Sequence, residues 1–446
     1  MNDKKIWRRR QFLKCVANTG LAGALMGLTN FSCTKKQKRP NILLIVTDDQ
    51  GINDVSAYGS EIPTPNIDEI GQNGIRFTNF YVTAPVCTPS RYGLLTGRYQ
   101  YRSTEAFQEA LLPRDPKHEE VHLSEDEVTI ADVLKRDGYK TALIGKWHLG
   151  HGDVEFGPNN HGFDYFYGFL PGCIDYYKHT YESDPSWYRN KTLIEEEGYA
   201  TDLLTDEAIR FIEEHKDVPF FLDLSYNAPH YGRCPDGKLL QSPPEAKELP
   251  EKSVADRAVY EAMVKNLDKG IGRVIETLRR LQLEEDTIVI FCSDNGGDYD
   301  YGGNNKPYRG EKGTLWEGGI KVPCHIQWKG HIQPDQTSDQ PIISLDFFPT
   351  LIRLTGAAFT DGILDGHDIS DVLLNNKPAP DRYLFFRRKN QIAVRDKSWK
   401  YLKDSDDKEY LFDLTNDPYE QYNLLDESPE QAHLLKTKFE EFFQNL

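Results

Sequence analysis

The chain has no Cys-x-x-Cys spacing among its seven cysteines, so the usual signature of a zinc-binding module is absent. Positive charge is also scarce, since 53 Lys and Arg face 70 Asp and Glu and leave a formal net charge of −17. This balance argues against nucleic acid or an anionic membrane as a general partner. An anionic substrate stays open, provided that its site is locally cationic. Residues after Arg39 contain no repeat or low-complexity tract, and 446 residues suffice for one large domain with a smaller one.

The first 33 residues have the order of a targeting segment: basic, then apolar, then small. Arginines 8–10 precede Gln-Phe-Leu-Lys, which resembles a twin-arginine export signal. The apolar stretch at 16–28 is too short to span a bilayer as an ordinary helix. Ser32-Cys33 loosely resembles a bacterial lipoprotein processing site. We therefore predict an exported protein, either secreted, periplasmic or at the cell surface. Its one expected link to a membrane is a lipid anchor at Cys33, which would place it on the outer membrane.

Continuous apolar runs of strand length alternate with helical patterns along most of the chain. The runs lie at 41–47, 141–145, 220–226 and 287–292. The clearest helical pattern covers 255–281, where apolar residues recur every three or four positions. Strands covered on both faces and separated by helices predict an α/β fold, a large mostly parallel sheet with helices on both faces.

The pattern changes from about Asp381. Short alternating runs predict a small antiparallel sheet, and residues 429–443 predict a final helix packed on it. We therefore expect an export signal at 1–33, a catalytic domain at 40–375 and a C-terminal α+β subdomain at 380–446.

Residues 87–97 read Cys-Thr-Pro-Ser-Arg-Tyr-Gly-Leu-Leu-Thr-Gly and carry the strongest chemical signal. Ser90 and Arg91 are expected to open a helix that ends near Gly97. Cys87 then lies near a helix N-terminus, where backbone N–H groups favour an anion. Arg91, one turn further on, can direct its guanidinium back towards Cys87. The alternative is a buried structural cysteine beside a turn.

Each predicted core strand is followed by polar residues. In open α/β sheets, ligands bind in the crevice beyond the carboxyl ends of the strands, so these groups are expected to meet there. The residues that follow the four strands are Asp48-Asp49, Lys146-Trp147-His148, Pro229-His230 and Asp294-Asn295.

The acidic and amide members of this set offer only oxygen ligands. Asp48, Asp49, Asp294 and Asn295 suit a hard divalent cation, with Ca²⁺ favoured over Mg²⁺ and Zn²⁺ disfavoured. Three basic side chains are expected in the same crevice, where they would offset the acidic field of the whole chain at short range. They are Arg91, Lys146 and Lys312, the last in a glycine-rich loop at 310–319.

These motifs occur in an order that resembles type I sulfatases of the alkaline phosphatase superfamily, from Pro40 to nearly the C-terminus. The resemblance covers the Cys87 motif, Gly-Lys-Trp-His-Leu-Gly at 145–150 and the acidic pairs. It implies an alkaline phosphatase-like fold and one Ca²⁺ ion. It also implies that a separate enzyme, either a formylglycine-generating or a sulfatase-maturating enzyme, oxidises Cys87 to formylglycine. The metal ligands implied are Asp48, Asp49, the modified Cys87, Asp294 and Asn295.

The resemblance and the residue chemistry together assign roles. One hydroxyl of the hydrated formylglycine attacks sulfur and forms a sulfate-ester intermediate, with Arg91 steadying the diol. Lys146 and Lys312 bind the sulfate oxygens. His230, with Lys312 beside it, protonates the leaving alcohol, and His148 takes a proton from the second hydroxyl to expel sulfate.

Resemblance to exported bacterial sulfatases implies a sulfated carbohydrate substrate, such as an algal ulvan or carrageenan or a glycosaminoglycan. Segments 161–167, 172–181 and 298–309 are rich in Tyr, Asn and His and are candidate pocket walls. With no appended binding module, we expect action on oligosaccharide ends. Two alternatives remain: a phosphodiesterase or phosphonate monoester hydrolase of the same superfamily, and a non-catalytic sulfoglycan-binding protein that keeps Cys87 unmodified.

Overall fold

The central strand of the fold is β1 (Asn41–Thr47), whose seven residues are all buried. The computed structural model describes residues 39–234, 237, 239–249, 256–360 and 362–446. By their contacts, Arg39–Leu446 form one unit. The predicted export signal and the lipidation site at Cys33 lie outside the described residues. Among the residues described, no helix combines the length and apolar character needed to cross a bilayer.

The large sheet has ten strands, and its middle is parallel, as predicted. The four apolar runs of the sequence are four of the five central parallel strands. Their order, with the fifth strand last, is β11 (Thr287–Ser293), β1, β10 (Phe220–Ser225), β4 (Lys140–Lys146) and β5 (Tyr165–Phe169).

Antiparallel pairings occur towards both edges of this sheet. Beyond β11 lie β12 (Cys324–Gln327), β2 (Ile75–Phe77) and β13 (Gln336–Ser338). Beyond β5 lie β8 (Tyr188–Arg189) and β9 (Thr192–Leu193). Two further pairs are formed by β3 (Phe80–Tyr81) with β14 (Ile342–Ile343), and by β6 (Thr180–Tyr181) with β7 (Asp184–Pro185).

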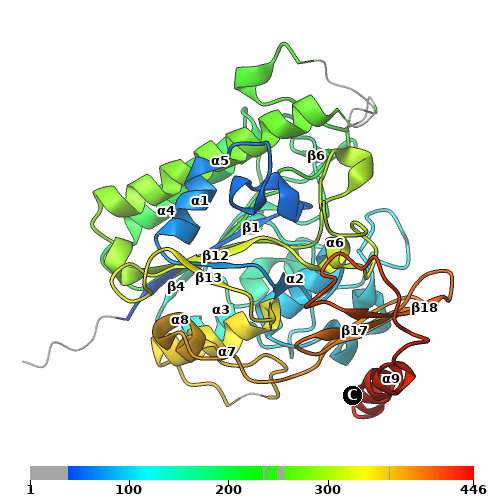
Figure 1. Ribbon diagram of the computed structural model, residues 1–446. Coiled ribbons are helices and arrows are strands. Elements are labelled where there is room, and N and C mark those ends of the chain that lie inside the picture. The colour runs from blue at the N-terminus through cyan, green and yellow to red at the C-terminus, as the bar shows by residue number, and fades with distance from the viewer. Residues whose placement is uncertain (1–38, 235–236, 238, 250–255, 361) are drawn as a thin grey trace, which may run out of the picture. The chain divides into compact units, whose positions relative to one another are not determined.

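Helices cover both faces of the sheet. Successive residues of β1 point to opposite sides, so they contribute to two separate cores. Ile42, Leu44 and Val46 belong to one core cluster, and Leu43 and Ile45 belong to the other. The first cluster includes residues of α2 (Cys87–Thr96), α3 (Ile130–Arg136), α7 (Phe347–Thr355) and α8 (Ser370–Asn375). The second includes residues of α1 (Pro65–Gln72), α4 (Ala200–Glu214) and α5 (Arg257–Arg280), the predicted long helix (Figure 1).

Helix α2 begins at Cys87, three residues before the predicted start, and ends at Thr96. Val86 is extended at the N-cap, and Pro89 falls in the first turn, where a missing N–H breaks no helical hydrogen bond. Gly97 ends the helix at φ +64°, and its N–H donates to the carbonyl of Gly93. A Cβ at position 97 would meet Phe348 at 2.8 Å, so glycine is required by both conformation and space.

The C-terminal region is the predicted antiparallel sheet with a helix. Its strands are β15 (Leu384–Arg388), β16 (Gln391–Arg395), β17 (Trp399–Lys403) and β18 (Glu409–Asp413), followed by α9 (Pro429–Gln444). Val394, Tyr401 and Leu411 pack with Leu435 of α9. Residues on the other face pack with Tyr81, Leu315 and Trp316 of the main body. The boundary between the two predicted domains, after residue 375, stays a prediction.

Buried charges also join this small sheet to the main body. Lys400 of β17 is fully buried and pairs with Glu317 at 2.9 Å and Glu420 at 2.8 Å. Glu317 belongs to the short helix α6 (Glu317–Ile320), which begins within the glycine-rich segment of Lys312. Glu317 also accepts a hydrogen bond from Tyr81. Removing one partner of such a buried cluster leaves uncompensated charge in a low-dielectric interior.

We therefore expect Lys400→Ala to reduce the free energy of unfolding by about 3–5 kcal/mol, because two buried carboxylates lose their cation. Lys403→Ala is the matched control, since Lys403 lies on the same strand but pairs with Asp407 at the surface. Its effect should be small. Denaturant unfolding curves of both variants check this expectation, and equal destabilisation would contradict it.

Candidate active site

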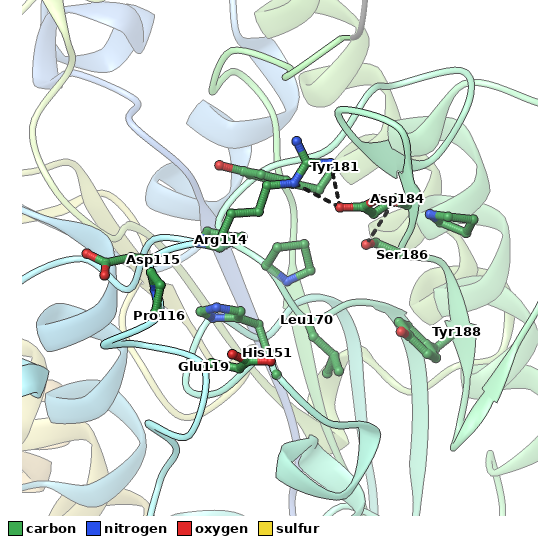
Figure 2. Close-up of a pocket in the computed structure, with 14 residues that line it drawn as sticks. Arg114, Asp115, Pro116, Glu119, His151, Leu170, Tyr181, Asp184, Ser186 and Tyr188 are labelled. Atoms are coloured by element: carbon green, nitrogen blue, oxygen red, sulfur yellow. Dashed lines mark hydrogen bonds and ion pairs between the residues drawn. The ribbon is translucent and has the colours of Figure 1, made fainter.

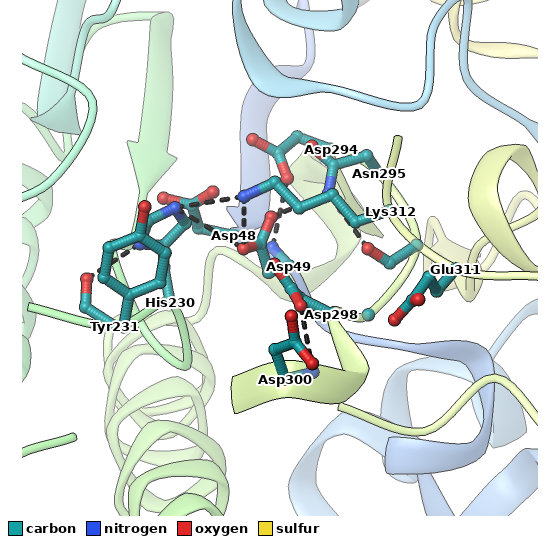
Figure 3. A network of polar contacts seen from close by, with 12 residues as sticks. Asp48, Asp49, His230, Tyr231, Asp294, Asn295, Asp298, Asp300, Glu311 and Lys312 are labelled. Atoms are coloured by element: carbon teal, nitrogen blue, oxygen red, sulfur yellow. Dashed lines mark hydrogen bonds and ion pairs between the residues drawn. The ribbon is translucent and has the colours of Figure 1, made fainter. Parts of the chain in front are cut away.

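The ends of the central parallel strands bring the predicted polar residues into one buried cluster. Asp48 and Asp49 follow β1, Lys146 is the last residue of β4, and Asp294 follows β11. Figure 3 shows the residues from β1, β11 and the Lys312 loop facing one another, with His230 alongside. The cluster thus forms where parallel sheets of this kind bind ligands.

Asp48 and Lys146 form a fully buried ion pair, with Oδ2 and Nζ 2.6 Å apart. Burial, with the neighbouring carboxylates of Asp294 and Asp49, raises the pKa of Asp48 in spite of Lys146. Burial acts against the charge of Lys146, but Asp48, Cys87 and Asp294 together outweigh it and raise the pKa of Lys146. Lys146 is therefore a fixed positive charge at the site.

Asp49 is held by two neighbours and adopts φ +60°. Its Oδ2 lies 2.5 Å from Lys312 Nζ, and its Oδ1 accepts a hydrogen bond of 2.7 Å from Asn295 Nδ2. Burial alone would raise the pKa of Asp49, but Lys312 and then His230 lower it to about 2. At Lys312, burial acts against the charge, but Asp49, with Cys87 and Asp48, outweighs it and raises the pKa of the ammonium. This pair is therefore charged at neutral pH.

His230 is oriented by the backbone of the next residue. Its Nδ1 donates to the Tyr231 carbonyl at 2.8 Å, which leaves Nε2 3.2 Å from Lys312 Nζ and 3.4 Å from Asp49 Oδ2. Burial lowers the pKa of His230 well below its ordinary value, Asp49 opposes this, and Lys312 adds to it. His230 and Lys312 thus form a pair between which a proton can pass.

The guanidinium of Arg91 contacts Asp294. Nε and Nη2 lie 3.0 and 2.9 Å from Asp294 Oδ2, and Nη1 donates to the Lys146 carbonyl at 3.3 Å. Burial opposes the charge, but Asp294, then Asp48 and Cys87, raise the pKa of Arg91. Arg91 therefore connects the C-terminal ends of β11 and β4 and places positive charge near Cys87.

Cys87 lies in the first turn of α2 and is only 3% exposed. Burial raises the pKa of its thiol, although Lys146 and Lys312 act to lower it. The unmodified side chain is consequently a thiol rather than the thiolate that a cysteine nucleophile requires.

His148 has the tautomer that a base needs. Its Nε2 donates to the Leu111 carbonyl at 2.8 Å, so Nδ1 carries the lone pair, and buried Nδ1 has no hydrogen-bond partner among the described residues. Burial and then Lys146 lower the pKa of His148 far below its usual value. Gly172 packs against this ring, where a Cβ would come within 2.6 Å of it.

The oxygen groups of the cluster fit a divalent cation. Asp48 Oδ1 and Asn295 Oδ1 are buried, and neither has a hydrogen-bond partner in the described part of the chain. Ligand atoms of Asp48, Asp49 and His230 lie within 4.8 Å of one another. A cation would satisfy both orphaned oxygens and relieve the repulsion between the carboxylates. Sequence reasoning did not include His230 among these groups, because its place beside Asp49 depends on the loop after β10.

Sequence reasoning also missed Asn227, which lies two residues after β10. It is 1% exposed, and neither its amide nitrogen nor its amide oxygen has a hydrogen-bond partner within the described residues. The signal was available, since Asn227 belongs to the same polar segment as His230.

Two of the three predicted pocket segments reach cavities. Tyr181 lines a cavity of about 320 Å³ that also includes Arg114 and His151 (Figure 2). Tyr301 lines another of about 520 Å³ with Tyr231. The segment 161–167 is different, because His161 is buried and stacks on Trp147, with ring centroids 5.5 Å apart. The imidazole of His161 therefore packs in the core, and a pocket wall formed by the rest of this segment stays a prediction.

Known proteins share both the fold and the sequence pattern. A family model described as Sulfatase matches residues 40–357, and one described as N-sulphoglucosamine sulphohydrolase, C-terminal, matches residues 310–445. Steryl-sulfatase of Homo sapiens is 32% identical over 80% of this chain and 74% of its own length. Arylsulfatase A of Bos taurus is 33% identical over 90% of this chain and 88% of its own length.

Solved structures agree with these relatives. The crystal structure of Ps i-CgsB in complex with k-i-k-neocarrahexaose has a TM-score of 0.81 and 32% identity, over 91% of this chain and 93% of that one. With the strand-end cluster and the Cys87 motif, these likenesses lead to one conclusion. The chain belongs to the sulfatase family, as a type I sulfatase of the alkaline phosphatase superfamily that hydrolyses sulfate esters.

Proposed function

We propose that the enzyme removes sulfate from O-sulfated sugars of a polysaccharide or oligosaccharide. The observation that carries this proposal is the set of three cations around Cys87 in a strongly acidic chain: buried Arg91 and Lys146, and half-buried Lys312. Such a site is locally suited to a tetrahedral anion. The sugar is supported by the likeness to Ps i-CgsB, whose structure contains a neocarrahexaose. Algal galactans or ulvan and glycosaminoglycans remain the candidate polymers.

Two groups complete the chemistry. Formylglycine at position 87, made from Cys87 by a maturating enzyme, would supply a hydroxyl nucleophile where burial keeps the thiol protonated. A Ca²⁺ ion held by Asp48, Asp49, Asp294 and Asn295, next to position 87, would supply positive charge to the sulfate oxygens. Export, a lipid anchor at Cys33 and action on chain ends are proposals that rest on the sequence alone.

The two lysines bind and orient the sulfate group. Lys146 and Lys312 are anchored by Asp48 and Asp49, so their ammonium groups are fixed before substrate arrives. Preorganised charge of this kind stabilises a transition state without reorganisation, and removing one donor typically costs about 10²–10³ in rate.

Proton transfer is assigned to two histidines, His230 and His148. His230 Nε2, 3.2 Å from the Lys312 ammonium, is placed to pass a proton to the leaving alcohol oxygen. His148 has the free lone pair on Nδ1 and is placed to accept a proton when sulfate is released. The first transfer depends on the alcohol, whereas the second is common to all substrates.

The first prediction concerns the reaction itself. Enzyme produced with its maturating partner should release sulfate from a sulfated oligosaccharide and turn over an aryl sulfate faster than an aryl phosphodiester. Cys87→Ala should abolish both activities, because position 87 carries the nucleophile. A faster phosphodiester reaction would favour the phosphodiesterase alternative. Mass spectrometry that finds only the thiol at Cys87 in enzyme from its native host would favour the binding protein.

The second prediction separates the histidines. His230→Ala should reduce turnover of a sugar sulfate, a poor leaving group, by about 10²–10⁴ and that of 4-nitrophenyl sulfate much less. His148→Ala should reduce both alike, because sulfate release follows departure of the alcohol. Steady-state rates on both substrates test this, and equal losses in His230→Ala would remove it from the acid role.

The third prediction concerns the cation and needs no activity. Ca²⁺ should raise the melting temperature of the wild type. At a hundredfold excess over Kd, the expected gain in free energy of unfolding is about 2.7 kcal/mol. Asn295→Ala should lose most of this shift, because it removes an orphaned ligand oxygen. Asn266→Ala is the control, since Asn266 is also buried with an unpartnered Oδ1 but lies in α5. An equal calcium shift in both variants would contradict the site.

A further inference from the structure

We propose that the cavity beside His230, lined by Tyr231, Arg233 and Tyr301, binds the sugar that carries the scissile sulfate, and that Arg233 recognises a second negative charge on it. The inference rests on the proposed function and deepens it. It commits to a substrate class, namely sugars that bear an additional sulfate or carboxylate besides the sulfate to be removed.

Tyr231 connects the cavity to the catalytic groups. Tyr231 lies along its wall and packs on His230, with ring centroids 4.2 Å apart, as Figure 3 shows. Lys312 Nζ is 5.9 Å from the centroid of the same ring. Because His230 and Lys312 face the leaving oxygen, whatever is attached to that oxygen extends towards Tyr231. The cavity of about 520 Å³ is large enough for a small ligand.

Two aromatic rings from separate segments form one wall. Tyr231 follows β10, whereas Tyr301 comes from the loop after β11, and their rings stack with centroids 4.1 Å apart at 28°. Both side chains are half-buried, so part of each remains accessible. Tyrosine combines an apolar face with a hydroxyl, which suits the mixed apolar and hydroxyl surface of a sugar ring.

Arg233 places a cation at the rim of this wall. Its Nε lies 3.3 Å from Glu182 Oε1, and its guanidinium lies 5.7 Å from the centroid of the Tyr181 ring. The contact with Glu182 engages Nε, and a guanidinium carries four further N–H donors on Nη1 and Nη2. Planar paired donors of this kind match the oxygens of a sulfate or carboxylate.

Glu182 forms ion pairs with two arginines, Arg233 and Arg114. The tip of the β6–β7 hairpin places its carboxylate between Arg233 and Arg114, and Arg114 also pairs with Asp184 at 2.6 Å (Figure 2). Because one carboxylate is shared between two guanidinium groups, Glu182 neutralises the positive charge of Arg233 only in part. Glu182 is also the one acidic residue on the described wall of this cavity.

The test measures KM and kcat for three substrates: a monosulfated disaccharide, the same disaccharide with a second sulfate or a carboxylate, and 4-nitrophenyl sulfate. Wild-type enzyme should prefer the doubly anionic sugar. Arg233→Ala should raise KM for that sugar by about tenfold or more, since it loses a charge-assisted contact. The change for the other two substrates should be several-fold smaller, and Arg233→Lys should recover part of the loss. Comparing the second sulfate with the carboxylate identifies which anion is recognised.

Arg114→Ala is the matched control, because it removes a partner of the same Glu182 from the side of the other cavity. It should keep most of the wild-type preference, because Arg233 retains its donors on Nη1 and Nη2 even when Glu182 pairs with it alone. Equal effects of Arg114→Ala and Arg233→Ala, or an equal loss on all three substrates, would mean that the hairpin is merely loosened and would overturn the subsite. If the wild type releases sulfate from sugars without this dependence, only the subsite fails. If it releases none from any sugar, the proposed function fails.

Discussion

Two ion pairs, the fully buried Asp48 with Lys146 and the largely buried Asp49 with Lys312, are the interactions on which the active site depends. Charges without water are costly unless each has a partner, so neither lysine nor carboxylate can be removed alone. Pairing also fixes both ammonium groups before substrate arrives. The remaining carboxylate repulsion and the two orphaned oxygens explain why the same residues fit a divalent cation.

Both parts of the fold position these pairs. The parallel strands deliver Asp48 and Lys146 from neighbouring regions of a rigid sheet. Lys312 lies on a loop, and the small C-terminal sheet holds that loop. Arg388 Nη1 and Gln391 Nε2 both donate to the carbonyl of the next residue, Gly313, at 2.5 and 3.2 Å. The C-terminal sheet therefore contributes to the site without supplying any of the groups proposed for catalysis.

Most of the fold was predictable because its signals are local. The central strands are continuous apolar runs, and the long helix α5 has an apolar face of regular spacing. The start of α2 was predicted three residues late, because Val86 is the N-cap and Cys87, Thr88 and Pro89 form the first turn. The predicted pocket segment at 161–167 shows a limit of such local signals. Aromatic composition does not reveal whether a ring stacks in the core, as His161 does on Trp147.

The sequence by itself determined the residue types, the strands that carry them and the edge of the sheet where they meet, since strand periodicity and the Cys87 motif are properties of neighbouring residues. Only the tertiary structure decided the partners. The hydrogen bond that fixes the His148 tautomer, the turn of Arg91 towards Asp294 and the placing of Tyr301 against Tyr231 join positions far apart in the chain. Such contacts depend on loop paths and packing, which no local pattern encodes.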